Sequence, residues 1–433
     1  MVSTFILLLL SFQLFSSISE AVVPASETFT YVNQGRFGSY IVEYYANYRE
    51  LPPFSNPFQL CFYNTTPNAF TLALRMGTVV SEPLMRWVWE ANRGNPVREN
   101  ATLTFGTDGN LVLADDDERV VWQTNTANKG VVGFQLLPTG NMVLHDGKGN
   151  YLWQSFHSLT DTLLVGQTLR AGGPNKLVSR LSEVSNFDGS YSLVMEPKGL
   201  SMYYKSPNSP RPMLYWSSSE WFTIDQGSLT NLTLNSVADN EFVYYLFFNY
   251  FTTNRTRSSI RYMVHSGYNN TLSYLRLGID GNLRFYTYNP NMQGVEWKLV
   301  YTFLDRDSIE GECQLPGRCG NFGLCEDSQC VACLTPNGLS GWSKECEVKK
   351  VTSCKTSDFG YYKLQRVDHF MIKYTRGVAT KQSDCESKCT KDCKCMGYFY
   401  HTDSSRCWIA YDLKTLTRVG NSTHLAYIKT PNK

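Results

Sequence analysis

The sequence is short of charge, and over most of its length it is short of cysteine. Charged residues make up 18% of the 433 residues, against about 25% in an average domain. The formal net charge is only +2, which provides neither a basic field for nucleic acid nor a polybasic patch for an anionic membrane. Beyond the N-terminal segment, no apolar stretch is long enough to span a bilayer. We therefore expect neither a nucleic-acid-binding protein nor an integral membrane protein.

The signatures of enzymes are also missing. We find no nucleophile elbow, phosphate-binding glycine loop, zinc-protease motif or usefully spaced carboxylate pair. His157 and Asp161 suggest a relay, but no nucleophile accompanies them, and we interpret both as structural. The six histidines show no metal-ligand spacing, and we interpret the acidic run 115–118 as a solvated turn. We predict no metal, no cofactor and no enzymatic activity.

The N-terminus indicates export from the cell. An apolar run from Phe5 to Phe15 precedes small residues at Ser19 and Ala21. The run is short for a membrane anchor, the alternative reading, and is typical of a secretory signal peptide, which we predict to occupy residues 1–21. Asn-x-Ser/Thr glycosylation sequons fit the same route. They lie at Asn64, Asn100, Asn231, Asn254, Asn269 and Asn421.

The cysteines are concentrated at the other end of the chain. Of the 13, all but Cys61 lie between Cys313 and Cys407, a clustering typical of disulfides in an oxidising compartment. Cys385, Cys389 and Cys393 recur every fourth residue, which predicts one face of a helix from about 381 to 392. Cys61 lies in an apolar strand. It is either a buried thiol or a bridge between two chains, which would make a homodimer.

The chain contains an internal repeat. The stretch from Phe105 to Gln123 recurs as Leu136 to Gln154, with Gly-Asn, Val-Leu and Trp-Gln pairs unchanged. Each copy consists of a Gly-Asn turn, a short strand, a polar turn and a strand that ends in tryptophan, which predicts a β-hairpin. We expect these hairpins to share one core through their tryptophans. A weaker copy at 278–286 indicates a related second domain.

Several of these stretches resemble known plant families. The segments WVWEANRGNPV (87–97), GNLVL (109–113) and LWQSF (152–156) resemble the bulb-type, mannose-binding lectin domain. The region that follows resembles the S-locus glycoprotein domain, and the cysteine blocks resemble an EGF-like and a PAN/apple module. This order resembles the ectodomain of S-domain receptor kinases and, since no kinase follows, the epidermis-specific secreted glycoproteins of the plant cell wall.

The resemblance implies a fold. It implies a mainly β protein with two tandem β-prism domains, at 22–165 and 166–305. An EGF-like module at 306–347 and a PAN/apple domain at 348–433, with one helix on an antiparallel sheet, complete the chain. It also implies the disulfides Cys313–Cys325, Cys319–Cys330, Cys333–Cys346, Cys385–Cys407, Cys389–Cys395 and Cys354–Cys393.

The resemblance further implies a sugar site, which the sequence keeps only in part. The family motif is Q-x-D-x-N-x-V-x-Y, in which the polar side chains bind mannose hydroxyls and valine touches the apolar face of the sugar. No copy is intact. The third copy keeps Asp280, Asn282 and Tyr286 but has Gly278 and Arg284 in the motif, and Asp-Gly-Asn also suits a tight turn without any sugar. The carbohydrate-binding candidates are Asp108, Asn110 and Val112 of the first repeat and Asn141 and Val143 of the second.

Two functions follow from these observations. The first is a secreted cell-wall glycoprotein with weak, mannose-type carbohydrate binding, whose partners are glycans or glycoproteins of the wall. The alternative is a non-catalytic protein that binds a secreted hydrolase or a receptor ectodomain, with vestigial lectin sites. The degenerate motifs favour the alternative, and the Asp108, Asn110 and Val112 core favours the lectin.

Overall fold

The computed structural model describes residues 22–77, 85–219, 227–237, 243–252, 254, 256–266, 272–289, 297–308, 310–335, 338–344, 346, 351, 353 and 355–432. The predicted signal peptide at 1–21, Asn269 and Cys354 lie outside these residues. The described part is mainly β, as predicted. Its helices are short: η1 (Ala25–Glu27), η2 (Glu43–Tyr45), η3 (Ser155–His157), η6 (Glu312–Gln314) and the α-helix α2 (Gln382–Lys391).

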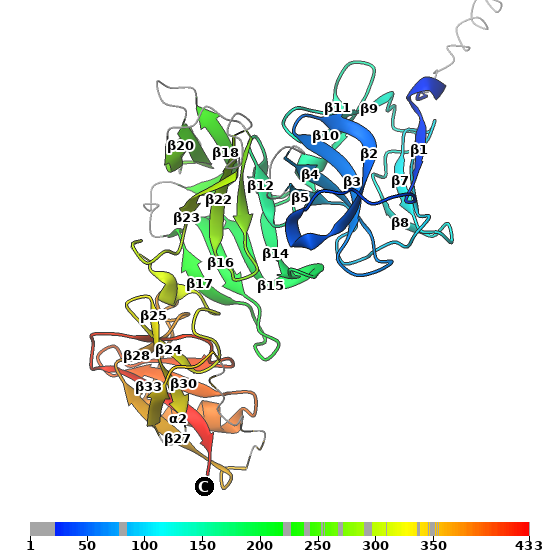
Figure 1. Ribbon diagram of the computed structural model, residues 1–433. Helices are drawn as coiled ribbons and strands as arrows, with labels where there is room; N and C mark the ends of the chain where they lie inside the picture. Colours follow the sequence, from blue (N-terminus) through cyan, green and yellow to red (C-terminus); the bar gives the residue numbers. More distant parts are fainter. Residues whose placement is uncertain are drawn as a thin grey trace, which may run out of the picture.

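The first region, blue to cyan in Figure 1, is a prism of three sheets around one core. The first repeat forms β6 (Thr102–Phe105), β7 (Leu111–Ala114) and β8 (Val120–Gln123), to which β1 (Phe29–Val32) adds. The second repeat forms β9 (Gly133–Leu136), β10 (Met142–His145) and β11 (Tyr151–Gln154). The third sheet consists of β2 (Asn47–Ser55), β3 (Phe58–Asn64), β4 (Thr71–Met76) and β5 (Arg86–Glu90).

Tryptophans join the three sheets of this prism. Trp89, Trp122 and Trp153 come from one sheet each and meet edge to face. Their ring centroids lie 5.9, 6.4 and 5.8 Å apart, the geometry that aromatic pairs prefer. The prediction that the hairpins share a core through their tryptophans is confirmed.

The second region repeats this architecture with three four-stranded sheets, green in Figure 1. One sheet consists of β12 (Thr162–Leu164), β21 (Ser273–Leu277), β22 (Leu283–Tyr288) and β23 (Trp297–Thr302). Another consists of β13 (Thr168–Arg170), β18 (Ser228–Val237), β19 (Val243–Phe251) and β20 (Arg257–Ser266). The third consists of β14 (Lys176–Ser182), β15 (Ser185–Glu196), β16 (Gly199–Tyr204) and β17 (Met213–Ser217).

The C-terminal region, yellow to red in Figure 1, contains two five-stranded sheets. The first joins β26 (Gly338–Gly341), β25 (Gln329–Thr335), β24 (Gly323–Glu326), β32 (Leu416–Arg418) and β28 (Val367–His369). The second joins β27 (Phe359–Gln365), β33 (His424–Pro431), β30 (Gly397–His401), β31 (Arg406–Ala410) and β29 (Val378–Ala379). Because β24 pairs with β32 in parallel, the first sheet takes strands from both of the segments that were predicted to be an EGF-like module and a PAN/apple domain.

Disulfide bonds cross-link this region. The pairs are Cys313–Cys325, Cys319–Cys330, Cys333–Cys346, Cys385–Cys407 and Cys389–Cys395, and they coincide with those that the resemblance implies. Cys393 is also disulfide-bonded, while Cys354, its implied partner, lies outside the described residues. Cys385 and Cys389 project from α2, which confirms the predicted helix.

Candidate carbohydrate-binding site

Asn110 of the first repeat holds its own hairpin together. Its amide nitrogen donates to Gln123 Oε1 at 2.8 Å. Its amide oxygen accepts from the Thr124 hydroxyl at 3.0 Å and from the Thr126 backbone N–H at 3.1 Å. The residue is buried. Because both lone pairs of the oxygen are engaged, only one amide N–H remains for a ligand.

Asn141 plays the same part in the second repeat. Its amide nitrogen donates to Gln154 Oε1 at 2.9 Å, and its oxygen accepts from the Ser155 hydroxyl at 3.3 Å and the Phe156 N–H at 3.2 Å. We call this arrangement, in which a motif asparagine ties β7 to β8 or β10 to β11, the asparagine latch. The latch explains the recurring Gly-Asn and Trp-Gln pairs without a sugar.

Asp108 and Val112 remain on the open side of the first repeat. Asp108 is exposed, and its carboxylate accepts the Asn110 backbone N–H at 3.0 Å. Val112 is half-buried and alternates along β7 with the core residues Leu111 and Leu113, so that it faces outward. Asp108 and Val112 thus offer a carboxylate and an apolar patch to solvent.

The second repeat is closed at the corresponding position. Val143 alternates along β10 with the core residues Met142 and Leu144, but its exposed fraction is 0%. Thr139, which replaces the motif aspartate, is exposed and carries no charge. A sugar therefore cannot reach Val143 in this structure.

In the third copy of the motif, in the second prism, the polar side chains bond to other groups of the protein. The carboxylate of Asp280 forms an ion pair with the Arg284 guanidinium, with contacts of 2.9 and 2.5 Å. Burial raises the pKa of Asp280, but the hydrogen bonds and charge of Arg284 outweigh it and leave this pKa below its usual value. Asn282 is buried, its amide nitrogen donates to the Leu304 carbonyl, and its amide oxygen accepts the Leu304 backbone N–H.

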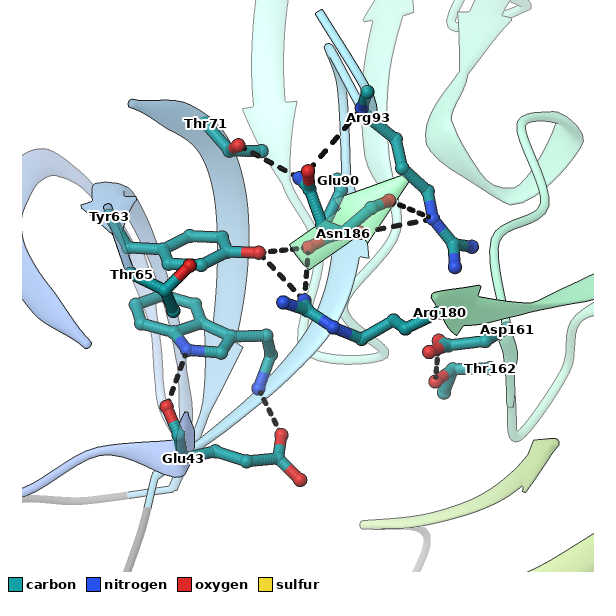
Figure 2. Close-up of polar contacts among 12 residues, drawn as sticks. Glu43, Tyr63, Thr65, Thr71, Glu90, Arg93, Asp161, Thr162, Arg180 and Asn186 are labelled. Carbon is teal, nitrogen blue, oxygen red and sulfur yellow. Dashed lines mark hydrogen bonds and ion pairs between the residues drawn. The ribbon is translucent and has the colours of Figure 1, made fainter. Parts of the chain in front are cut away.

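The outer face of the third sheet in the first prism is covered by protein. Cys61, Tyr63 and Trp87 alternate with core residues along β3 and β5, yet they are buried in a cluster of their own with residues that include Val42 and Tyr48. Figure 2 shows that Arg180 of the second prism also reaches this face. Arg180 of β14 reaches Glu90 Oε1 and the Tyr63 hydroxyl, both at 2.8 Å.

A second buried ion pair crosses between the prisms. Arg276 of β21 lies 2.6 Å from Glu43 of η2 and donates to the Thr162 hydroxyl at 3.0 Å. The exposed fractions of the two charged side chains are 7% and 11%. The Glu43 carboxylate also accepts the Trp87 backbone N–H at 3.1 Å. Sequence analysis missed both ion pairs, because nothing in the sequence links residues so far apart.

The predicted glycosylation sites differ in exposure. Asn100, Asn254 and Asn421 are exposed, and Asn231 is half-buried. Asn64 has an exposed fraction of only 4% and lines a crevice together with Ser185 and Phe187 of the second prism. This burial argues against a glycan at Asn64, since a glycan needs an accessible side chain.

Other residues singled out from the sequence have structural roles. His157 is exposed, and desolvation by its surroundings lowers its pKa, while Asp161 accepts the Thr162 hydroxyl at 2.8 Å. The acidic run folds around Arg98, which pairs with Asp115, Asp116 and Asp117. Cys61 is a buried free thiol with an exposed fraction of 0%. It cannot bridge two folded chains, so the homodimer that rested on such a bridge is not supported.

One cluster of ionisable groups escaped sequence analysis altogether. Asp368, His401 and His424 come together in the C-terminal region, and their ligand atoms all lie within 4.8 Å of one another. They are far apart in the sequence, at separations of up to 56 residues, and match no spacing motif. The pairing of β30 with β33 brings the two histidines together, and the packing of β28 from the other sheet adds Asp368.

Comparisons with known proteins agree with this architecture. The D-mannose binding lectin family model matches residues 86–182, and the S-locus glycoprotein domain model matches residues 224–343. EP1-like glycoprotein 4 of Arabidopsis thaliana is 47% identical over 99% of this chain and 97% of its own. Epidermis-specific secreted glycoprotein EP1 of Daucus carota is 53% identical over 79% of this chain and 92% of its own.

Receptor kinases are more distant relatives. A G-type lectin S-receptor-like serine/threonine-protein kinase of Arabidopsis thaliana is 24% identical over 84% of this chain but only 42% of its own length. The similarity thus covers less than half of the kinase. Within the described residues, no helix is long and apolar enough to cross a membrane.

Proposed function

Because the chain belongs to the family of EP1-like, epidermis-specific secreted glycoproteins, we propose that it is a secreted, non-catalytic glycoprotein of the cell wall that binds mannose-type glycans weakly. The binding surface is the outer face of β6, β7 and β8. The proposal includes the division of the chain at residues 165, 305 and 347, and glycans at the exposed sequons Asn100, Asn254 and Asn421.

The exposed Asp108 and the outward-facing, half-buried Val112 are the observation that carries this proposal. A carboxylate accepts hydrogen bonds from sugar hydroxyls, and such charge-assisted bonds are stronger than neutral ones. The Val112 side chain can make an apolar contact with the apolar face of the sugar. Gly106 and Ala114 stand where the family has Gln and Tyr, which removes two polar contacts worth about 1 kcal/mol each. Affinity for a single sugar is therefore low, and multivalent display is needed to detect it.

Binding to a panel of densely immobilised glycans tests the proposal. The secreted protein is compared with Asp108→Ala, which removes the exposed carboxylate. Thr139→Ala is the matched control, because Thr139 occupies the same position in the closed second repeat and is also exposed. We expect mannose-type glycans to retain the wild type and Thr139→Ala but not Asp108→Ala.

Two outcomes would count against this site. Binding that Asp108→Ala retains in full would place the sugar elsewhere on the molecule. Absence of binding by a folded wild-type sample would remove carbohydrate recognition and leave the second candidate.

That second candidate is a partner protein on the same face. Val32 and Val120 are exposed there, by 37% and 50%, and the equivalent face of β2 to β5 is already covered by protein. A secreted hydrolase or a receptor ectodomain would bury the two valines. Val120→Glu should then abolish capture of the partner while Asp108→Ala leaves it intact.

A further inference from the structure

The C-terminal region brings two histidines and an aspartate together from three strands. His401 ends β30 and His424 begins β33, and the two residues lie directly opposite each other in the antiparallel pairing of these strands. Their rings stack with centroids 3.4 Å apart and an interplanar angle of 14°. Asp368 of β28 reaches both rings from the neighbouring sheet.

The carboxylate of Asp368 receives one nitrogen from each ring. Its Oδ1 lies 3.0 Å from His401 Nε2, and its Oδ2 lies 2.8 Å from His424 Nδ1. The exposed fractions of the side chains are 13% for Asp368, 10% for His401 and 19% for His424. The cluster is therefore shielded on most sides but not sealed.

We propose that Asp368, His401 and His424 form a binding site for a divalent transition-metal ion, with Zn²⁺ as the reference ion. Imidazole nitrogen and carboxylate oxygen are ordinary ligands of Zn²⁺, at about 2.0–2.2 Å. The three ligand atoms already lie within 4.8 Å of one another. Side-chain rotations that bring these atoms around one ion would let it replace the hydrogen bonds between the carboxylate and the two rings, with the coordinating ring nitrogens deprotonated.

The chemistry of the ligands selects the kind of metal. Two imidazoles favour zinc, copper or nickel over magnesium and calcium, which take oxygen ligands. Thiols would compete for such ions, but the ten cysteines of the five described pairs are bonded as disulfides and Cys61 is buried. This pair of histidines is thus the strongest nitrogen ligand set in the part of the chain that the structure describes.

The site has an access path. All three residues line a cavity of about 590 Å³. Three protein ligands leave the fourth tetrahedral position of zinc open to this cavity. Arg376 and Arg406 line the same cavity, and their positive charges favour an anion as the fourth ligand.

The position of the site has a structural consequence. Asp368 belongs to the sheet that includes strands of the EGF-like segment, whereas His401 and His424 belong to the other sheet of the C-terminal region. An ion at this point would link the two sheets. Because the ion binds only the folded arrangement, it would raise the unfolding temperature of this region as its concentration rises.

Metal titration of the secreted full-length protein tests the proposal. The protein is stripped with a chelator, desalted and titrated with ZnCl₂ by calorimetry, and bound zinc is counted by mass spectrometry after gel filtration. We expect one zinc ion per chain in the wild type and none in the His401→Gln/His424→Gln double variant. His157→Gln, a histidine substitution outside the cluster, should bind zinc like the wild type.

A second readout guards against a double variant that fails to fold. Co²⁺ added to the stripped wild type should give the visible absorption of a four-coordinate nitrogen and oxygen site, and Zn²⁺ should displace it. Absence of zinc binding by the wild type, retention of the ion by a folded double variant, or a Co²⁺ spectrum of the hydrated ion alone would each overturn the proposal. The cluster would then be a hydrogen-bonded triad only.

Discussion

The outer faces of two sheets in the first prism differ in their exposure to solvent. The outer face of β6, β7 and β8 is open to solvent and bears small or short side chains, such as Thr104 and Val112. The outer face of β2 to β5 bears Tyr63 and Trp87, which are buried against residues of the segment 42–46, and Arg180 of the second prism reaches the Tyr63 hydroxyl. The comparison teaches that two sheets of one prism can differ in whether their outer face is covered, and that the covered face bears the larger side chains.

Charge sharpens the difference between the two faces. On the open face, charges such as Asp108 lie in water and add little to stability. On the covered face, Glu90 pairs with Arg180 and Glu43 pairs with Arg276, with all four side chains largely buried. A buried pair contributes little net stability when intact, but losing one partner leaves an uncompensated charge. The covered face is therefore the sensitive one.

The largest effect should come from breaking a buried pair. Glu43→Ala removes the nearer partner of the buried Arg276 and leaves only Asp161, 4.0 Å away, and we expect it to lower the free energy of unfolding by about 3–5 kcal/mol, measured by urea denaturation. Replacing both partners with methionine should restore most of the loss. Asp117→Ala, on an exposed turn, is the control and should change stability by less than about 0.5 kcal/mol. A loss below about 1 kcal/mol for Glu43→Ala would mean that the pair is not buried in solution.

The asparagine latch should be the next most sensitive feature. Asn110→Ala and Asn141→Ala leave buried donors and acceptors without partners, and each should cost about 1–3 kcal/mol in thermal unfolding. Asp108→Ala should cost less than about 0.5 kcal/mol, because its carboxylate is exposed. Equal losses in Asn110→Ala and Asp108→Ala would contradict the separation between a structural and a ligand-facing residue.

The smallest effect concerns Cys61 beneath the covered face. Burial raises the pKa of this thiol to about 12, so that at pH 8 it is protonated as well as inaccessible. We expect no alkylation by iodoacetamide under native conditions and complete alkylation in denaturant, followed by mass spectrometry. Alkylation of the native protein at the rate of a free thiol would show that this face is not covered in solution.

Local patterns in the sequence predict much of this molecule. The repeat gives the hairpins and the shared tryptophans, because strand alternation and turn residues are properties of short segments. The spacing of Cys385 and Cys389 gives α2 for the same reason. The resemblance adds the order of the modules and the disulfide pairs.

What the sequence does not predict depends on contacts between distant segments. Asn110 and Val143 look like ligand-facing motif residues, yet the first is engaged in the latch and the second is buried. Asn64 satisfies a glycosylation sequon but lies against the second prism. The Asp368 cluster depends on the meeting of two sheets. None of these features leaves a mark in the local pattern, because each is created by packing.

Restoring the sugar motif in each repeat tests the central claim most directly. The claim is that the first repeat is open and the second is closed. A Cβ at Gly106 would lie 2.9 Å from the Asp108 carboxylate, which can rotate away, so Gly106→Gln/Ala114→Tyr completes the first motif. In the second repeat Leu137, Thr139 and His145 stand where the motif has Gln, Asp and Tyr, so Leu137→Gln/Thr139→Asp/His145→Tyr completes the second.

Affinity for a mannose oligosaccharide is then measured by saturation-transfer NMR and calorimetry. The account predicts a gain of about tenfold or more for the restored first repeat, since two added contacts are each worth about 1 kcal/mol. It predicts no gain for the restored second repeat, where Val143 is buried. No gain in the first repeat, or an equal gain in both, would contradict the account.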